Sequence, residues 1–120
     1  MDYVQLLQSV ELVAGVDRDG ARRAVAATMA TLAERLGRPA TDALAGALPG
    51  ELREPLAAAP ATGEAFDAGE FVRRTAAREG RTPEQARRDA RAVFATLKED
   101  VAAVDRLREQ LPPDYAALFG

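Results

Sequence analysis

The chain has 120 residues, of which 48% are hydrophobic and 29% are charged, and its formal net charge is −3. A chain of this length suits one domain and buries roughly two-thirds of the surface that its unfolded form exposes. It contains neither Cys nor His, which excludes disulfides, thiolate nucleophiles, imidazole bases and the usual zinc ligands. Because the two signs of charge are interspersed, no overall field attracts nucleic acid or an anionic membrane.

The N-terminal stretch, MDYVQLLQSVELVAG, opens with an acidic residue and lacks the basic region of a secretory leader. No apolar run approaches the roughly 20 residues of a membrane span. We therefore expect a cytoplasmic protein without a membrane partner.

The two halves of the sequence resemble each other. Residues 2–36 align with residues 67–101 without a gap, and 8 of the 16 residues in 21–36 are identical to their counterparts in 86–101. Farther along, Leu48-Pro49 matches Leu111-Pro112 after the second half has lost two positions. Such a pattern indicates a duplication. We predict one all-α domain over residues 1–120, with repeat one (1–58) and repeat two (66–120) joined by the linker 57–65 and forming one compact helical bundle.

Each repeat is predicted to contain about four helices. In repeat one, Asp2 caps a helix that ends at Gly15, and Asp17 caps a longer helix that Gly37 and Pro39 stop. The apolar residues of these two helices recur every three or four positions, as a buried helix face requires. They are Tyr3, Leu6, Leu7, Val10 and Val13 in the first helix, and Val25, Met29, Leu32 and Leu36 in the second.

The remainder of repeat one is more broken. Thr41 is expected to open a third helix that runs through Leu44 and Leu48. After Pro49-Gly50, the segment ELREPL allows at most a short fourth helix, because Pro55 lacks the N–H that an interior helical residue donates.

Repeat two contains the strongest local signal of the chain. Thr82 to Gln85 form a capping box with Pro83 at the first helical position, so a long helix is predicted over 83–101. A further helix is expected around Val104, Leu107 and Leu111, and no β-strand is expected. We expect the helices 18–36 and 83–101 to pack near each other about a pseudo-two-fold axis. The apolar stripe of the second of these is Ala86, Ala90, Val93, Phe94, Leu97 and Val101.

Three stretches of the chain carry a family resemblance. They are Asp2-Tyr3 with Leu6-Leu7, the segment from Gly15 to Ala24, and LPPDYAALF at 111–119. Together they resemble a bacterial family catalogued as domain of unknown function 2267, over nearly the whole chain. The resemblance implies the fold and a bacterial origin, and it brings no activity, cofactor or catalytic residue. The chain departs from the family pattern at Pro55 and at Asp89, which stands opposite Ala24.

Arginines are numerous and partly repeated. Arg22-Arg23 and Arg87-Arg88 occupy equivalent positions, and repeat two adds Arg73, Arg74, Arg78, Arg81 and Arg91. Clustered arginines are one signature of a phosphate-binding surface. However, an acid lies four positions before Arg23, Arg74 and Arg88, which are Asp19, Glu70 and Glu84. Each such helical ion pair contributes only about 0.2–0.5 kcal/mol, so we favour a solvated, paired face.

Other reactive side chains form no catalytic or metal-binding pattern. Glu99-Asp100, and Asp105 with Glu109, do not have a known ligand spacing. Thr31 and Thr96 lack a neighbouring base and are expected to donate to the carbonyl one turn earlier. We therefore predict no catalytic residue, no metal site and no cofactor.

These observations favour a non-enzymatic helical protein that binds another protein or itself, with Tyr3, Tyr115 and Phe119 as aromatic anchors. The alternative is a nucleic-acid-associated protein that uses the Arg-rich face of repeat two. Since each half has about 60 residues and few aromatics, we also expect the halves to share one core. The candidate interaction residues are Arg22, Arg23, Arg74, Arg87, Arg88, Arg91, Tyr115 and Phe119.

Overall fold

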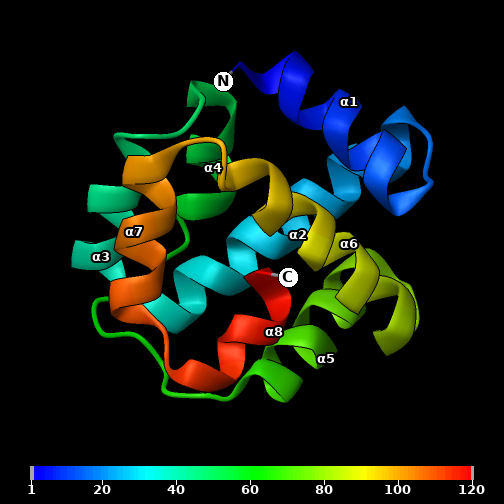
Figure 1. Ribbon diagram of the computed structural model, residues 1–120. Helices are drawn as coiled ribbons and strands as arrows, with labels where there is room; N and C mark the ends of the chain where they lie inside the picture. Colours follow the sequence, from blue (N-terminus) through cyan, green and yellow to red (C-terminus); the bar gives the residue numbers. More distant parts are fainter. Residues whose placement is uncertain (1, 120) are drawn as a thin grey trace.

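The computed structural model describes residues 2–119, except for the side chain of Val101, and within this range it contains eight α-helices and no strand (Figure 1). The all-α prediction is confirmed. A short 3-10 helix precedes each of the last helices of the two halves, Gly50–Leu52 before α4 and Pro113–Tyr115 before α8. The α-helices are α1 (Tyr3–Ala14), α2 (Arg18–Leu36), α3 (Arg38–Ala45), α4 (Arg53–Leu56), α5 (Ala68–Glu79), α6 (Pro83–Leu97), α7 (Val101–Gln110) and α8 (Ala116–Phe119).

The predicted helix caps are present in the structure. The side chains of Asp2 and Asp17 accept hydrogen bonds from backbone N–H groups in the first turns of α1 and α2, which satisfies donors that have no partner within the helix. Thr82 forms the expected capping box at the start of α6. Gly15 and Gly80 end α1 and α5 with the same left-handed φ of 68°, a conformation that glycine adopts without strain.

The prediction that Thr41 opens the third helix is wrong. α3 begins at Arg38 and ends at Ala45, short of Leu48. Pro39 lies in its first turn, where a missing N–H costs no helical hydrogen bond. Pro39 therefore starts α3 instead of stopping α2, and Gly37, with a φ of 80°, makes the break between them.

The end of the second long helix and the buried face of α1 also differ from expectation. The helix predicted over 83–101 ends at Leu97, because the Asp100 side chain accepts a hydrogen bond from the Ala103 N–H and starts α7. Val101, expected on the stripe of that helix, has a side chain outside the described residues. Val13, expected to be buried, is 57% exposed. The buried face of α1 consists of Leu6, Leu7, Val10 and Ala14.

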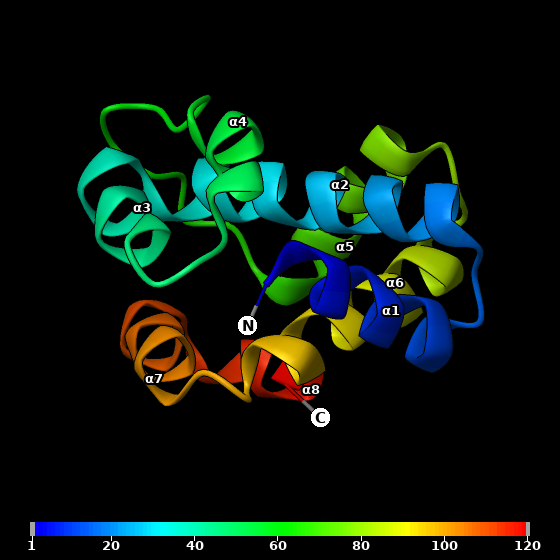
Figure 2. The ribbon, with the colours of Figure 1, turned by 90° about the horizontal axis from the view of Figure 1, so that it is seen from above.

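The two longest helices, α2 and α6, contact each other as predicted. α2 spans the molecule, with α3 and α4 near one end and α1, α5 and α6 near the other (Figure 2). α1 packs on α6 as well as on α2, and α5 packs on α2 as well as on α6. α2 also contacts α3 and α4 as α6 contacts α7 and α8. Each of these contacts made by one half thus has a counterpart made by the other half, which supports the proposal that the halves arose by duplication.

The buried side chains form one continuous core cluster that draws on both halves. The first half contributes aliphatic residues such as Leu6, Met29 and Leu32. The second half contributes a chain of aromatic rings, in which Phe71 lies 5.8 Å from Phe94 between ring centroids. The other rings of this chain are Phe66, Tyr115 and Phe119.

The linker 57–65 packs against the end of α2. The Glu64 N–H donates to the Glu34 carbonyl at 3.0 Å, and the Arg38 N–H donates to the Pro60 carbonyl at 2.7 Å. Gly63 lies so close to the α2 C-terminus that a Cβ at this position would collide with the Arg35 carbonyl. The linker therefore holds the second half in a defined place on the first.

Replacing the buried Leu97 with Ala should lower the free energy of unfolding by about 2–5 kcal/mol, because it leaves a cavity where α6 meets the core. Leu12→Ala on α1 is the matched control, since Leu12 is 85% exposed and its change should stay within about 0.5 kcal/mol. Urea unfolding followed by circular dichroism gives both values. Similar losses for the two variants would contradict the assignment of the core.

Candidate interaction surface

Two grooves lie on the surface, one along each of the long helices. Groove A, of about 550 Å³, runs along α2 and is bordered by α4, and groove B, of about 360 Å³, runs along α6 beside α8. The lining of groove A is Tyr3, Arg22, Arg23, Val25, Ala26, Ala27, Ala30, Glu51, Leu52, Glu54, Pro55 and Arg78. The lining of groove B is Val13, Glu84, Arg87, Arg88, Arg91, Ala95 and Phe119.

The grooves occupy equivalent places in the two halves. At the offset that aligns the halves, Arg22, Arg23 and Ala30 of groove A match Arg87, Arg88 and Ala95 of groove B. The two grooves differ at two pairs of aligned positions: Ala26 of groove A corresponds to Arg91 of groove B, and Arg78 of groove A corresponds to Val13 of groove B. The arginine pairs singled out in the sequence thus line corresponding surfaces, and each pair comes with its own apolar floor.

Groove B has fewer carboxylates to balance its arginines than groove A has. Its three arginines are accompanied by one carboxylate, Glu84, whereas the three arginines of groove A are accompanied by Glu51 and Glu54. None of the ion pairs that the described residues form involves an arginine of groove B. In groove A, by contrast, Arg78 contacts Glu34 at 3.1 Å. Groove B therefore presents exposed cations around apolar side chains.

Of the three ion pairs predicted from helical spacing, one forms. Glu70 and Arg74 pair at 2.9 Å between Oε2 and Nε. Asp19 instead approaches Arg22, at 3.9 Å, and no described contact joins Glu84 to Arg88. The expectation of a fully paired arginine face is therefore wrong for α6.

Tyr115 is buried, so its predicted role as a surface anchor is wrong. Its hydroxyl donates a hydrogen bond to the Phe66 carbonyl at 2.7 Å. The rings of Phe71 and Tyr115 form a T-shaped pair, with 5.7 Å between their centroids. Burial raises the pKa of Tyr115 to about 12, which keeps this donor protonated. The position of Tyr115 in the aromatic core explains its fixed orientation.

Phe119 is also largely buried, which corrects the prediction that it is an exposed anchor. Its ring stacks on Phe94 at 5.1 Å between centroids, while one part of the residue reaches the lining of groove B. Tyr3 is half-buried and lines groove A. These aromatics shape the groove walls, and the exposed contacts come from other residues.

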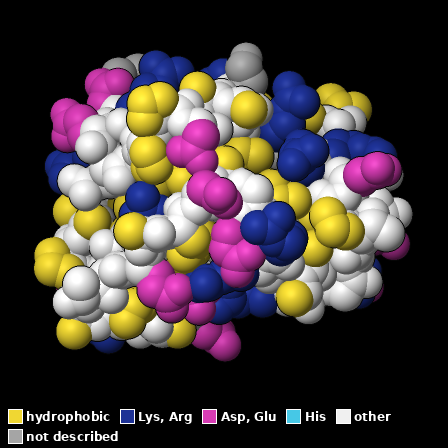
Figure 3. Space-filling model, turned by 90° about the horizontal axis from the view of Figure 1, so that it is seen from below, with side chains coloured by type: hydrophobic (Ala, Val, Ile, Leu, Met, Phe, Trp, Pro, Cys, Tyr) yellow, Lys and Arg dark blue, Asp and Glu magenta, His cyan; other side chains and the backbone are white. Residues whose placement is uncertain are grey.

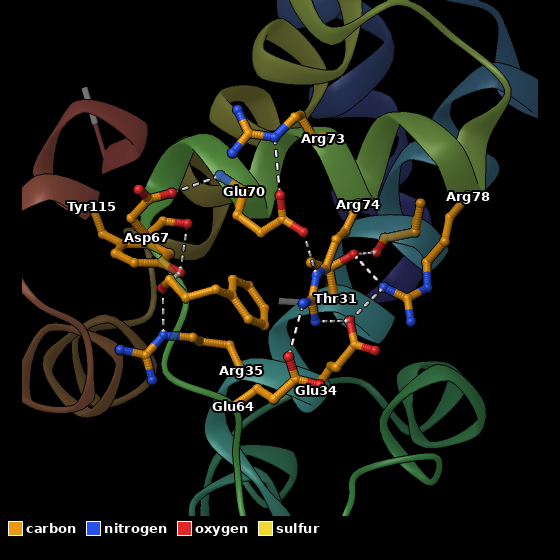
Figure 4. A network of polar contacts seen from close by, with 12 residues as sticks. Thr31, Glu34, Arg35, Glu64, Asp67, Glu70, Arg73, Arg74, Arg78 and Tyr115 are labelled. Atoms are coloured by element: carbon orange, nitrogen blue, oxygen red, sulfur yellow. Dashed lines mark hydrogen bonds and ion pairs between the residues drawn. The ribbon is translucent and has the colours of Figure 1, made fainter.

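Arg74, predicted as an interaction residue, instead joins the two halves (Figure 4). Its guanidinium contacts Glu34 on α2 at 3.2 Å, Glu64 in the linker at 2.8 Å and Glu70 on its own helix. It also lies over the Phe66 ring, with Cζ 4.1 Å from the centroid, a favourable cation–π position. The side chain is thus occupied by internal contacts.

The carboxylates around Arg74 are held in their charged form. Burial opposes ionisation of Glu34, but hydrogen bonds from Arg78 and Arg74 outweigh it, so the pKa of Glu34 lies below its ordinary value. Hydrogen bonds from Arg74 and Arg73 lower the pKa of Glu70 in the same way. Figure 3 shows the molecule from below, where acidic and basic side chains lie side by side across the middle of the face and hydrophobic side chains lie to either side.

A group of three charged residues, two of them buried, was missed by the sequence interpretation. Glu79 at the end of α5 and Asp89 on α6 are both buried, and the Arg81 Nε lies 3.5 Å from Glu79 and 2.9 Å from Asp89. At the aligned positions of the first half stand Ala14, Val16 and Ala24. The departure of Asp89 from Ala24 was visible in the alignment, but its partners, eight and ten positions earlier, were not.

Among residues 2–119, no three acidic side chains are grouped in a way that could hold a metal ion. None of the helices in that range has the length and apolarity that a membrane span requires.

The two threonine hydroxyls considered as nucleophiles are buried. Thr31 and Thr96 donate to the carbonyls of Ala27 and Ala92 at 2.9 and 3.0 Å, as predicted.

Residues 3–118 match the family described as uncharacterized conserved protein (DUF2267). The chain belongs to this family. The resemblance to this family that the sequence suggested is thereby confirmed over residues 3–118. None of the curated proteins compared with this DUF2267 chain matches it. Because the family description names no activity, the function must be argued from the grooves.

Within this DUF2267 chain, Arg74→Ala should lower the melting temperature by several degrees, because it breaks contacts that join α2, the linker and α5. Arg73→Ala is the matched control. Arg73 sits beside Arg74, is more exposed and pairs with Glu70 alone, so its loss should leave the melting temperature nearly unchanged. Equal shifts for the two variants in thermal denaturation would show that the network does not join the halves.

Proposed function

We propose that this protein is a non-enzymatic binding module whose partner is another protein. Groove B is the proposed binding site, and its occupant is an acidic, amphipathic segment of the partner. Acidic side chains of such a segment would face the arginines on the rim, and its apolar side chains would lie on the floor between α6, α8 and α1.

The observation that carries the proposal is the combination of uncompensated cations with exposed apolar surface. Arg87, Arg88 and Arg91 lie within two turns of α6, and none takes part in an ion pair formed by the described residues. The large apolar side chains that are exposed in the described part of the chain are Val4, Leu12 and Val13, all on α1. Of these three, Val13 lines groove B, so exposed apolar surface of α1 adjoins the arginine rim. Apolar contact would supply affinity, and the arginines would supply specificity and rapid association.

The residues that line groove B also support a role in binding over a role in catalysis. They are arginine, glutamate, valine, alanine and phenylalanine. Apart from the carboxylate of Glu84, no side chain that could attack a substrate is among them. An arginine rim can hold an anionic partner without performing chemistry on it.

A photo-crosslinking residue placed at Ala95, on the exposed floor of groove B, tests the proposal in living cells of the native host. We expect a covalent adduct with a second polypeptide. Ala102 on α7 is equally an exposed alanine outside groove B, and a crosslinker at that position should yield no such adduct.

The adduct should weaken when Arg87 and Arg91 are both replaced by Ala. Replacing Arg53 and Arg106 by Ala removes the same amount of exposed charge elsewhere and should leave the adduct intact. A crosslinking yield that does not depend on position or on the arginines of α6 would contradict the assignment of groove B. If the second polypeptide is another copy of this chain, the module acts by self-association.

A nucleic-acid ligand is the second candidate, and the unpaired arginines of α6 are the observation that favours it. It predicts retardation of DNA or RNA in gels, with an affinity that falls steeply with salt, by about 0.9 log units per log unit of salt for each phosphate contacted on duplex DNA. The net charge of −3 and the apolar side chains of groove B favour a protein partner. Retardation that Arg87→Ala/Arg91→Ala abolishes would reverse this preference.

A further inference from the structure

The buried acidic residues Glu79 and Asp89 lie outside both grooves and take no part in the proposed binding site. The side chain of Glu79 is fully inaccessible, and Asp89 is 1% exposed. They come from different helices, α5 and α6, and both contact Arg81 in the turn that joins these helices. Buried carboxylates are rare in proteins and are normally paired with cations and hydrogen-bond donors.

The surroundings do not neutralise two charged carboxylates. Arg81 is the cation in contact, and its Nε lies 2.9 Å from Asp89 Oδ2 and 3.5 Å from Glu79 Oε2. Neither contact has hydrogen-bond geometry, and all four carboxylate oxygens lack a donor in the described part of the chain. A buried acceptor left without a donor is costly, and a buried charge without a partner costs still more.

A proton shared between the two carboxyl groups removes both difficulties. A protonated carboxyl group becomes a donor, so it can hydrogen bond to the other carboxylate. The pair then carries one negative charge, which the single positive charge of Arg81 balances. Two carboxyl groups that share a site commonly behave in this way, because both cannot ionise side by side.

We propose that Glu79 and Asp89 form a proton-binding site that retains one proton in the folded protein at neutral pH, and that this proton stabilises the corner between α5 and α6. The site binds its proton on folding and releases it on unfolding. Burial of Glu79, together with the hydrogen bond and the charge of Asp89, raises the pKa of Glu79 to about 9, against the opposing charges of Arg81 and Arg23.

Few other charged groups face this site. Arg23 on α2 is close enough to act on Glu79 through its charge. α1, which also packs on α6, carries a single charged residue, Glu11, and it pairs with Arg18 at 2.6 Å. The charged residues described on α7 are exposed, and α8 carries none. The proton balance of the site therefore depends on Glu79, Asp89, Arg81 and Arg23.

The first half of the chain provides a natural control. Its aligned residues, Ala14, Val16 and Ala24, fill the corresponding corner between α1 and α2 with apolar side chains. The same local fold therefore forms there without charged groups at these three positions. Replacing a buried ion cluster by apolar residues often preserves or increases stability, so the variant Glu79→Ala/Arg81→Val/Asp89→Ala should fold.

The sign of the pH effect follows from the difference between folded and unfolded protein. The folded protein holds the proton up to about pH 9, whereas a glutamic acid in the unfolded chain releases it near pH 4.5. Between these values the unfolded state binds fewer protons, so stability falls as the pH rises. The unfolding equilibrium constant should increase by up to about tenfold per pH unit across this window.

The direct test is a carbon-13 NMR titration of the side-chain carboxyl groups in the intact protein. We expect one carboxyl group of the pair to remain protonated at pH 7 and to titrate far above the range of ordinary carboxyl groups. Ionisation of both carboxyl groups below about pH 5 would overturn the proposal.

The thermodynamic test compares urea unfolding of four proteins between about pH 5 and about pH 9. The wild type and Glu51→Gln, a control at an exposed carboxylate, should lose stability as the pH rises. Glu79→Gln, which mimics the protonated acid, and the apolar triple variant should lose this dependence. Retention of the wild-type dependence in Glu79→Gln or in the triple variant would overturn the proposal, because the dependence would then arise elsewhere.

Discussion

The structure depends on one constraint: the two long helices, α2 and α6, must bury their apolar faces against helices from both halves of the chain. Each of these helices packs on the first helix of its own half and on the first helix of the other half. The first half lacks a buried aromatic ring in its core, and its alanines bury little area each. Neither long helix therefore covers its apolar face within one half. The linker and Arg74 reinforce the same contact from outside, where the end of α2 meets Glu64 and α5.

The differences between the halves explain where the chemistry of the molecule resides. Ala26 and Arg91 occupy equivalent positions, and this difference makes groove B more basic than groove A. Arg78 occupies the place of Val13, and it turns toward Glu34 and Thr31, whereas Val13 stays exposed beside groove B. The third difference is the charged corner of α5 and α6. The second half thus contains both the buried pair proposed to hold a proton and the arginines of the surface proposed to bind a partner.

Features set by neighbouring residues were predictable from the sequence. Helix starts at Asp2, Asp17 and Thr82 depend on side chains three positions away at most, and the apolar stripes depend on helical spacing. Features set by distant residues were not predictable. The burial of Tyr115, which was predicted to be an anchor, could not be foreseen because its hydrogen-bond acceptor, the Phe66 carbonyl, lies 49 positions earlier. The grooves, and the placing of Glu79 and Asp89 around Arg81, likewise arise only when helices pack. Composition and spacing could therefore identify these arginines and acids but not their surroundings.

Native-state amide hydrogen exchange on the intact chain tests the central claim most directly. If α2 and α6 share one core, the most protected amides of both helices should open with the same free energy, which equals that of global unfolding. Amides near Met29 on α2 and near Phe94 on α6 are suitable reporters because both residues are fully buried. One helix that opens at clearly lower free energy while the other stays protected would show that the halves are separate units, and it would contradict the account.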